Sequence, residues 1–357
     1  MKQYIGCDAH RKYSMFVMVD ERGQTGAPVR VEHQREEFRK FLKQLPAGSP
    51  VAVEASGGWY WLMTELEAAG LEPHLADPYE AKKRMRGRNK TAALDARGLA
   101  LLLYDRRLPE VWIPPARLLD LRGLMRSRLA LRRHQSGLKN RILAAVNRYG
   151  LRGAEDSPSD CFQGKGRVRL SVWIGGLPEQ TREAAIHEWQ IVDQLEAHIR
   201  ELEQQIQQQI GKLGWVRLLQ TLPGVGRILG ATIHLEVGAV GRFPTAAHLA
   251  SYAGLVPRVY GSGGKTHHGS IAPDANRYLK WAFVEAANCT LMHRRKYGEQ
   301  HVGRLYQRLH AAKGHPKAIV AVARHLAEAS WWVLRKAESY REPAPAAVSS
   351  SENGSAR

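Results

Sequence analysis

The spacing of apolar residues changes once along the chain, and this change limits the possible folds more than any other feature. Before Leu94, short β-rich runs alternate with short helical stretches, whereas from Leu94 onward the apolar residues keep a helical spacing. The first two runs flank a tight polar turn and predict a β-hairpin. Strands are expected at residues 4–8, 13–19, 29–33, 51–54 and 73–76, and helices at 35–45 and 59–69. This order predicts an α/β layered domain with a mixed sheet.

Two long helices are predicted in the middle of the chain. Residues 117–149 are strongly basic and contain no proline, and a second helix is expected at 183–210. The Gly-, Ser- and Pro-rich interval 150–169 predicts a loop between them. The second helix carries an apolar seam with the 3-4-3-4 spacing of a coiled coil, formed by Val192, Leu195, Ile199, Leu202 and Ile206. Such a narrow seam needs a partner helix, either the first long helix or a helix of a second copy.

These patterns divide the chain into three regions and a tail. Residues 1–112 form the α/β domain, 113–212 the long-helix, coiled-coil region, and 213–340 a mostly α-helical domain interrupted by glycines. Residues 341–357 are rich in Pro, Ala and Ser and lack an apolar stripe, so they are predicted to be disordered.

The charge balance indicates the class of partner. The chain has 53 Lys and Arg against 34 Asp and Glu, a net charge of +19. Self-repulsion of this size is tolerated best beside a polyanion whose counterions are released on contact. The composition therefore predicts a nucleic-acid-binding protein, with a merely soluble or ribosome-associated basic protein as the alternative.

Cysteine usage and hydropathy predict the cellular location. Cys7, Cys161 and Cys289 are far apart and share no C-x-x-C spacing, which argues against a disulfide framework or a zinc site. The first residues have a strand pattern instead of that of a signal peptide, and no apolar run approaches the roughly 20 residues of a membrane span. We expect a cytoplasmic protein that does not contact a membrane.

Three carboxylates of the first domain form a candidate metal site. Asp8 and Glu54 end strands that should be neighbours, and Asp95 follows on a helix that begins near Thr91. Acidic groups at neighbouring strand ends, joined by one from a packed helix, can converge on Mg²⁺, which prefers hard oxygen ligands and phosphate oxygens. The alternative is that these are ordinary surface carboxylates.

Two further features predict contacts with nucleic-acid phosphates. The Leu-Pro-Gly-Val-Gly turn containing Gly224 and Gly226 lies between helical stretches, and such turns offer backbone N–H groups to a phosphate; an ordinary turn is the alternative. The first long helix is expected to hold phosphates through basic side chains, among them Arg132, Arg133, Lys139 and Arg141.

Ser262 is a candidate nucleophile in the third region. It lies in a glycine-rich segment between Arg258 and Lys265, where cations can stabilise the charge that develops during attack on a phosphodiester. Taken alone, a serine among glycines is usually part of a flexible turn. His267 and His268 are nearby and are interpreted as surface or phosphate-contacting groups.

Four segments resemble a known family. IGCDAHRKYSMFVMVD, VAVEASGGWYW and AKKRMRGRNKTAALDARGLA resemble the first domain of bacterial DEDD insertion-sequence transposases, and GLVPRVYGSGGKTHHGSIAPDANRYLKWA resembles that family's C-terminal serine motif. The resemblance covers roughly residues 1–340. It implies a RuvC/RNase H-like fold for the first domain and a separate transposase domain at the C-terminal side.

The resemblance also implies roles for individual residues. The family's carboxylates come in the order Asp, Glu, Asp, Asp; Asp8 and Glu54 match the first two, Asp95 the last, and Ser262 the serine of the C-terminal motif. Ala92 stands where the family has its third acid. Loss of that ligand should weaken metal binding, and water, Asp77 or Asp105 are open as substitutes. Lys90, just before this motif, is a further expected nucleic-acid contact.

For function, the resemblance implies a recombinase guided by a structured bridge RNA. Such enzymes assemble as dimers that pair into tetramers around donor and target DNA. The implied mechanism joins Ser262 covalently to DNA and uses Mg²⁺ held by Asp8, Glu54 and Asp95. Two alternatives remain: a metal-dependent junction-resolving nuclease, and a non-catalytic RNA- and DNA-binding protein, which Ala92 makes credible.

Overall fold

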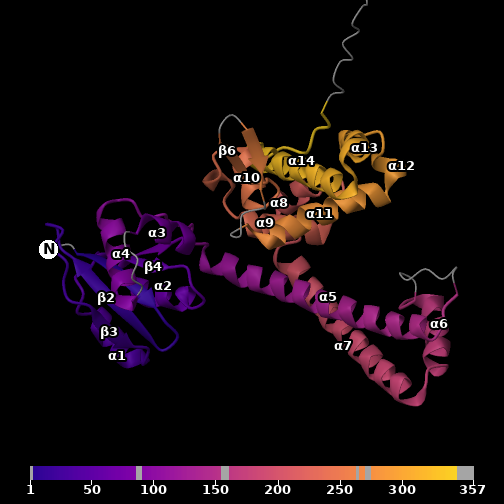
Figure 1. Ribbon diagram of the computed structural model, residues 1–357, viewed down its shortest axis with the longest axis horizontal. Helices are drawn as coiled ribbons and strands as arrows, with labels where there is room; N and C mark the ends of the chain where they lie inside the picture. Colours follow the sequence, from indigo (N-terminus) through magenta and orange to yellow (C-terminus); the bar gives the residue numbers. More distant parts are fainter. Residues whose placement is uncertain (1–2, 86–90, 154–160, 263–264, 270–274, 344–357) are drawn as a thin grey trace, which may run out of the picture. The chain divides into compact units, whose positions relative to one another are not determined.

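The computed structural model describes residues 3–85, 91–153, 161–262, 265–269 and 275–343, without the side chains of 259–268. Lys90 and the tail beyond residue 343 therefore lie outside the described residues. The chain forms two compact units, Met1–Ile113 and Pro114–Arg357 (Figure 1). The prediction of a mixed α/β N-terminal domain followed by a mostly helical remainder is confirmed. No helix in the described ranges is both long and apolar enough to cross a membrane.

The N-terminal unit is built on a five-stranded mixed sheet in the order β3-β2-β1-β4-β5. β1 pairs antiparallel with β2, and β2 pairs antiparallel with β3, whereas β4 lies parallel to β1 and β5 parallel to β4. The strands are β1 (Tyr4–Ala9), β2 (Tyr13–Val19), β3 (Val29–Glu32), β4 (Pro50–Glu54) and β5 (Glu72–Ala76). All five predicted strands are present, with ends within about one residue of the sequence prediction.

Helices cover both faces of this sheet. Ile5, Cys7 and Val53 point to the face packed by the apolar residues of α1 (Arg35–Leu42) and α2 (Trp59–Ala68). Because side chains alternate along a strand, Gly6 and Ala52 point to the other face. Ala52 packs there against Leu99 of α4 (Ala92–Tyr104) and Ala81 of α3 (Pro78–Arg84).

Gly6 lets α4 lie directly on strand β1. A β-carbon at Gly6 would be 1.9 Å from the carbonyl oxygen of Ala96 and 2.5 Å from the backbone nitrogen of Ala100, so no larger residue fits. The rings of Tyr4, at the start of β1, and Tyr104, at the end of α4, lie 5.3 Å apart. α4 therefore runs antiparallel to β1, and its N-terminus lies at the carboxyl end of the strand.

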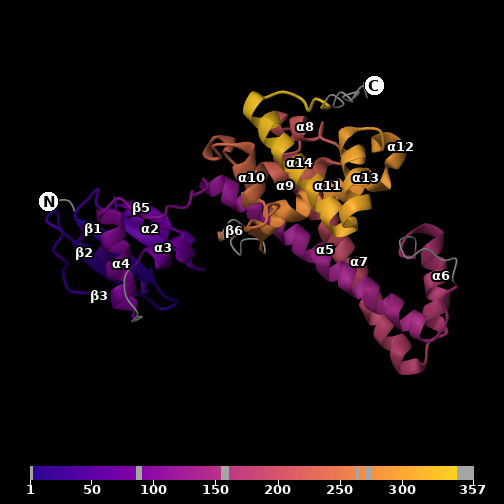
Figure 2. The same ribbon diagram turned by 45° about the horizontal axis from the view of Figure 1, so that its top comes forward.

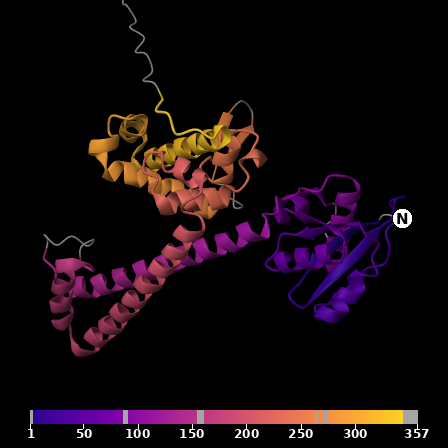
Figure 3. The same cartoon turned by 180° about the vertical axis from the view of Figure 1, so that it is seen from behind.

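The second unit begins with two long helices, α5 (Ala116–Arg148) and α7 (Glu179–Gln209), which lie side by side (Figures 1 and 2). The same pairing is visible from behind (Figure 3). Val192 packs with Ile142 and Val146 of α5, and Ile206 packs with Met125 and Leu129. The apolar seam of α7 therefore packs against α5 of the same chain.

One helix was not expected from the sequence. α6 (Gly164–Gly175) lies where the prediction has the end of a loop, and α7 begins earlier than predicted. Glycines at 164, 166 and 175 lower the intrinsic helix propensity of this segment. Packing stabilises it instead, because Leu170 and Ile174 are buried against residues of α5 and α7.

The rest of the second unit is a helical bundle with one small hairpin. Its core is formed largely by apolar residues of α9, α10, α11 and α14. The elements are α8 (Gly214–Leu219), α9 (Arg227–Val237), the short 3-10 helix η2 (Val240–Arg242), α10 (Ala246–Tyr252), β6 (Val259–Ser262), β7 (Lys265–His268), α11 (Arg277–Met292), α12 (Arg294–Tyr297), α13 (His301–Lys313) and α14 (His315–Lys336). The serine segment, expected to be a glycine-rich loop in a mostly helical domain, has the backbone of a two-stranded antiparallel hairpin.

Candidate functional site

The first candidate site lies at the carboxyl ends of β1 and β4. The parallel register pairs Gly6 with Ala52 and Cys7 with Val53, and the next residues along the two strands are Asp8 and Glu54. These two carboxylates are therefore neighbours on adjacent strands. By strand alternation they point to the face covered by α4.

The orientation of α4 brings Asp95 to the same edge. Asp95 precedes Ala96, the residue that touches Gly6, and lies on the first turn of the helix. Thr91 caps that turn, since its hydroxyl accepts a hydrogen bond from the backbone N–H of Leu94 at 3.3 Å. Ala92 is the first residue of the helix, so a carboxylate at this position would be one turn from Asp95 on the same side.

The donor set fits Mg²⁺ only in part. Among the described residues, no three His, Cys, Asp or Glu side chains are close enough together to hold a metal ion. Mg²⁺, however, commonly binds through one or two carboxylates together with substrate phosphates and several waters. Asp8 and Glu54 match that requirement, with Asp95 on the adjoining helix.

The two carboxylates suggested as substitutes for the missing acid, Asp77 and Asp105, differ in how close they lie to the site. Asp105 ends α4, ten residues after Asp95, which is about 15 Å along a helix. Asp77 directly follows Ala76, which pairs with Glu54, so it lies at the same edge of the sheet. Its carboxylate caps α3 by accepting from the backbone N–H of Glu80 at 2.8 Å. Asp77 is therefore the better-placed substitute.

Sequence reasoning missed His10 as a member of this site. Its Nε2 lies 3.2 Å from Oδ2 of Asp8, and the Asp8 side chain is only 13% exposed. His10 also lines a cavity of about 430 Å³ with Arg11, Ser56 and Gly57, at the same edge of the sheet. His10 follows Asp8 by two residues, on the β1–β2 turn. In a tight hairpin this spacing brings the imidazole within reach of the carboxylate, so the spacing could have indicated His10.

The second candidate site is the hairpin that carries Ser262. Ser262 ends β6 and its Cα pairs with that of Lys265 in β7. The side chains of both residues lie outside the described part of the structure. The backbone N–H of Gly269 donates to the carbonyl of Arg258 at 2.7 Å and closes the base of the hairpin. Arg258 thus directly precedes β6, and Lys265 is the first residue of β7.

Asn276 fixes the segment that follows this hairpin. Its backbone N–H donates to the carbonyl of Tyr252 at 2.7 Å, so the two ends of segment 252–276 are tied together. Its side-chain oxygen caps α11 by accepting from Tyr278 and Leu279 at 3.0 and 3.1 Å. Its side-chain Nδ2 donates to Oε2 of Glu236 at 2.9 Å. One asparagine therefore links the serine segment, α11 and α9.

Glu236 is the centre of a buried ionic network. Its carboxylate is 1% exposed and accepts two hydrogen bonds of 2.8 Å from Arg126 of α5. The same pairing raises the pKa of Arg126. Arg122 donates to the backbone carbonyls of Leu235 and Glu236 at 2.7 and 2.9 Å, and burial lowers its pKa. Sequence reasoning missed this network, which connects α5 to the serine segment through Asn276.

The Leu-Pro-Gly-Val-Gly turn connects α8 to α9. Gly224 has a φ of +73°, and a β-carbon there would be 2.1 Å from the carbonyl oxygen of Ala286, so the position requires glycine. Gly226 is the N-cap of α9, with no side-chain cap, and a β-carbon there would meet nothing within 4 Å. The turn therefore leaves the start of α9 open to an anion, as the phosphate prediction requires.

The predicted basic contacts of α5 have different surroundings. Arg132 bonds Glu196 at 3.1 Å and Arg141 bonds Glu188 at 2.6 Å, both in α7. Lys139 lies 5.2 Å from the centre of the Phe162 ring, and burial lowers its pKa. Arg133 is exposed and makes no ion pair with any described residue. Of the four, Arg133 is the side chain best placed for a phosphate.

Two family models match this chain. Residues 5–150 match a DEDD model described as "Transposase", and residues 216–302 match a model described as "Transposase IS116/IS110/IS902 family". The first covers the carboxylate edge and all of α5, and the second covers most of α8 to the start of α13 with the serine hairpin.

Curated relatives agree with these matches. A probable family 20 transposase of Pseudomonas aeruginosa is 25% identical over 264 residues, 72% of this chain and 75% of that protein. The transposase for insertion sequence element IS1111A of Coxiella burnetii is 23% identical over 94% of this chain and 91% of its own length. The pilin gene-inverting protein of Moraxella bovis is 32% identical over 33% of this chain and 36% of its own.

The chain is accordingly a transposase, an enzyme of the DNA-recombinase type whose substrate is DNA. The description of the second model, which names IS116, IS110 and IS902, gives the narrower group. The protein belongs to the IS110/IS116 family of insertion-sequence transposases.

Proposed function

We propose that this transposase cuts and rejoins the DNA of an insertion sequence with Ser262 as nucleophile and a Mg²⁺ site at Asp8, Glu54 and Asp95. The observation that carries the proposal is the register of β1 and β4, which makes Asp8 and Glu54 direct neighbours beneath the N-terminus of α4. The sheet order supports a RuvC/RNase H-like fold, because three antiparallel strands are followed by two parallel ones on the other side of β1.

Bound Mg²⁺ would supply Lewis-acid stabilisation of the phosphate oxygens. The chain's own part is to hold two carboxylates at a sheet edge, to place Asp95 above them by the close contact at Gly6, and to orient Asp8 through His10. With Ala92 in the place of a family acid, the DNA phosphate and water would complete the coordination.

In the proposed chemistry the Ser262 oxygen attacks a DNA phosphodiester. The new serine–phosphate ester replaces the bond to the leaving DNA hydroxyl, and attack by another DNA hydroxyl later restores a DNA phosphodiester and frees the serine. Each step forms one phosphoester bond for the one that it breaks, so no ATP is required. Lys265 pairs with Ser262 in the hairpin and Arg258 directly precedes β6, and cations at these positions would stabilise the pentacoordinate phosphate.

A structured guide RNA and an assembly of dimers into tetramers are further parts of the proposal, and they rest on the family resemblance together with the net charge of +19. The narrow seam of α7 is already covered by α5, so subunits would meet through other surfaces.

The test is strand transfer on labelled DNA that contains the element's junction, with Mg²⁺ and any RNA that co-purifies. We expect a protein-linked DNA band on a denaturing gel with the wild type and with Ser251→Ala, an exposed serine of the same region. Ser262→Ala should abolish the band. A band that persists with Ser262→Ala would remove the serine from the mechanism.

Other outcomes distinguish the alternatives. Mg²⁺-dependent cleavage without a protein-linked band would indicate a metal-dependent junction-resolving nuclease. Tight RNA and DNA binding without cleavage would indicate a binding protein. Ala92→Asp then tests the missing acid, with Ala93→Asp as a control that adds the same charge one residue further along α4. Recovery with Ala92→Asp alone would show that the alanine at this position limits activity.

A further inference from the structure

The two neighbouring tryptophans of α14 have different surroundings. Trp331 is 7% exposed, and its indole N–H donates to the carbonyl of Phe243 at 3.0 Å. Trp332 is 52% exposed. Trp331 therefore belongs to the core of the bundle, whereas Trp332 presents a large flat ring to solvent.

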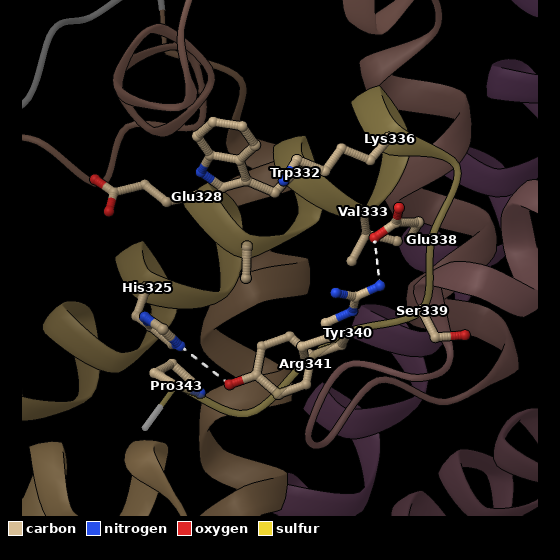
Figure 4. A pocket seen from close by; sticks show the side chains of 11 residues that line it. His325, Glu328, Trp332, Val333, Lys336, Glu338, Ser339, Tyr340, Arg341 and Pro343 are labelled. Atoms are coloured by element: carbon tan, nitrogen blue, oxygen red, sulfur yellow. Dashed lines mark hydrogen bonds and ion pairs between the residues drawn. The ribbon is translucent and has the colours of Figure 1, made fainter. Parts of the chain in front are cut away.

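A cavity of about 320 Å³ lies beside Trp332, between α14 and the segment 338–343 that folds back along it (Figure 4). Val333 and Tyr340 contribute further apolar and aromatic surface to its lining. The segment is anchored at Tyr340. Its phenol bonds Nε2 of His325 at 3.3 Å, and its backbone N–H donates to the hydroxyl of Thr221 at 2.8 Å. Polar contacts to α14 and to Thr221 thus hold this segment in place as one wall of the cavity.

The charges around the cavity leave a cation next to the exposed ring. The two carboxylates of the lining have partners, since Glu328 bonds Arg324 at 2.8 Å and Glu338 bonds Arg341 at 3.0 Å. The Lys336 ammonium lies 5.0 Å from the centre of the Trp332 ring. Residues 214–343 as a whole contain 18 Lys and Arg against 7 Asp and Glu, which favours an anionic ligand.

We propose that this cavity binds one unstacked base of a single-stranded nucleic acid. The base stacks on the indole of Trp332, with Tyr340 and Val333 lining the remaining space, and its phosphate lies near Lys336. Stacking on an aromatic ring is the usual way in which proteins hold unpaired bases, because every base has a flat face to offer. A base inside a duplex is already stacked on both faces, so the cavity selects single strands.

Neither Ser262 nor the carboxylate edge takes part in this site, so it can be tested without metal or cleavage. We would measure binding of the full-length protein to labelled 20-nucleotide oligo(dT), 20-nucleotide oligo(rU) and a 20-base-pair duplex by fluorescence anisotropy. Trp332→Ala should weaken single-strand binding about tenfold, the typical effect of losing one stacked base. Trp332→Phe, which keeps a flat ring, should lose less, and Trp215→Ala is the control for an exposed tryptophan outside the cavity.

Duplex binding should be unchanged in all three variants. A loss with oligo(rU) alone or oligo(dT) alone would support the site and identify the natural strand as RNA or DNA. Equal affinity of Trp332→Ala and wild type for both oligonucleotides, or an equal loss for the duplex, would overturn the proposal.

A second measurement does not depend on how the variants fold. An oligonucleotide carrying 5-iodouracil should crosslink on irradiation to Trp332 of the wild-type protein, within the tryptic peptide 325–335. Crosslinks found only at other peptides would also overturn the proposal.

Discussion

The buried contact between Asn276 and Glu236 should control the stability of the second unit. Asn276→Ser keeps a residue that caps helices well but removes the Nδ2 donor, which lies 2.9 Å from Glu236. A hydrogen bond to a charged group contributes about 1.5–3 kcal/mol, so we expect a loss of about 2 kcal/mol. Asn276→Asp also keeps the cap, but places a second carboxylate against Glu236.

The added repulsion can be worked from that distance. Two unit charges 2.9 Å apart repel by about 6 kcal/mol at an effective dielectric constant of 20, and Arg126 and relaxation offset part of this. We therefore expect Asn276→Asp to be at least about 2 kcal/mol less stable than Asn276→Ser at pH 7. The repulsion raises the folded-state pKa of the introduced carboxyl above its unfolded value of about 3.9. The extra loss is complete above the folded pKa, shrinks as the pH falls below it, and disappears below the unfolded value.

Urea unfolding followed by tryptophan fluorescence at pH 7 and pH 5 measures both effects. The comparison between the two variants cancels every titrating group that does not interact with the residue at position 276. Equal stability of the two variants at pH 7, or a difference between them that does not decrease at pH 5, would refute the assignment of Glu236 as a buried charged partner of Asn276.

Three further predictions concern other parts of the molecule. Gly6→Ala should destabilise the N-terminal unit by about 1–3 kcal/mol in thermal unfolding and reduce cleavage, because a β-carbon there lies 1.9 Å from the Ala96 carbonyl oxygen. Gly26→Ala, where a β-carbon would make an ordinary contact of 3.5 Å with the Met18 carbonyl oxygen, should change neither. Arg39 donates to Glu65, which is 6% exposed, and this hydrogen bond lowers the pKa of Glu65. The stability difference between wild type and Glu65→Gln should therefore be present above pH of about 4.5 and decline as the pH falls through the folded pKa, and a constant difference would contradict this. Arg133→Ala should lower the slope of DNA affinity against salt by about 1, whereas Arg132→Ala, which breaks contacts to Glu196, should mainly reduce stability; identical salt slopes for the two variants would contradict the distinction.

The sequence predicts the sheet of the first unit almost completely, and the reason is local. Residues 4–19 combine alternating apolar positions with a tight polar turn, and the later strands are bounded by polar or proline-containing turns. Helix α6 and the β6–β7 hairpin could not be predicted this way. Their glycines weaken the local signal, and α6 is stabilised by contacts with α5 and α7 that sequence spacing does not reveal.

The sequence predicts only those residues of the candidate site whose positions follow from the order of the strands. Neighbouring strand ends follow from the topology, so Asp8 and Glu54 could be placed together from the sequence. The Arg126–Glu236 pair joins residues separated by 110 positions in the sequence, and no local pattern predicts which arginine of a basic helix meets it. The sequence also does not predict the contact between Asn276 and Glu236, because an asparagine before a helix is expected only to cap that helix.

Several arginines of α5 form ion pairs within the chain, and these pairs affect how the positive charge of the chain can act on a nucleic acid. Each internal ion pair consumes one cation and one anion, so pairing leaves the net charge of +19 unaltered and the attraction to a polyanion persists at long range. At short range the pairs matter, because Arg126, Arg128 and Arg132 are already bonded to Glu236, Glu203 and Glu196. Releasing any of them to a phosphate would remove a charged hydrogen-bond donor from a carboxylate within the helix contacts. The arginines of α5 therefore serve in part to join α5 to α7 and α9, and we propose that contact with nucleic acid is made by exposed cations such as Arg133.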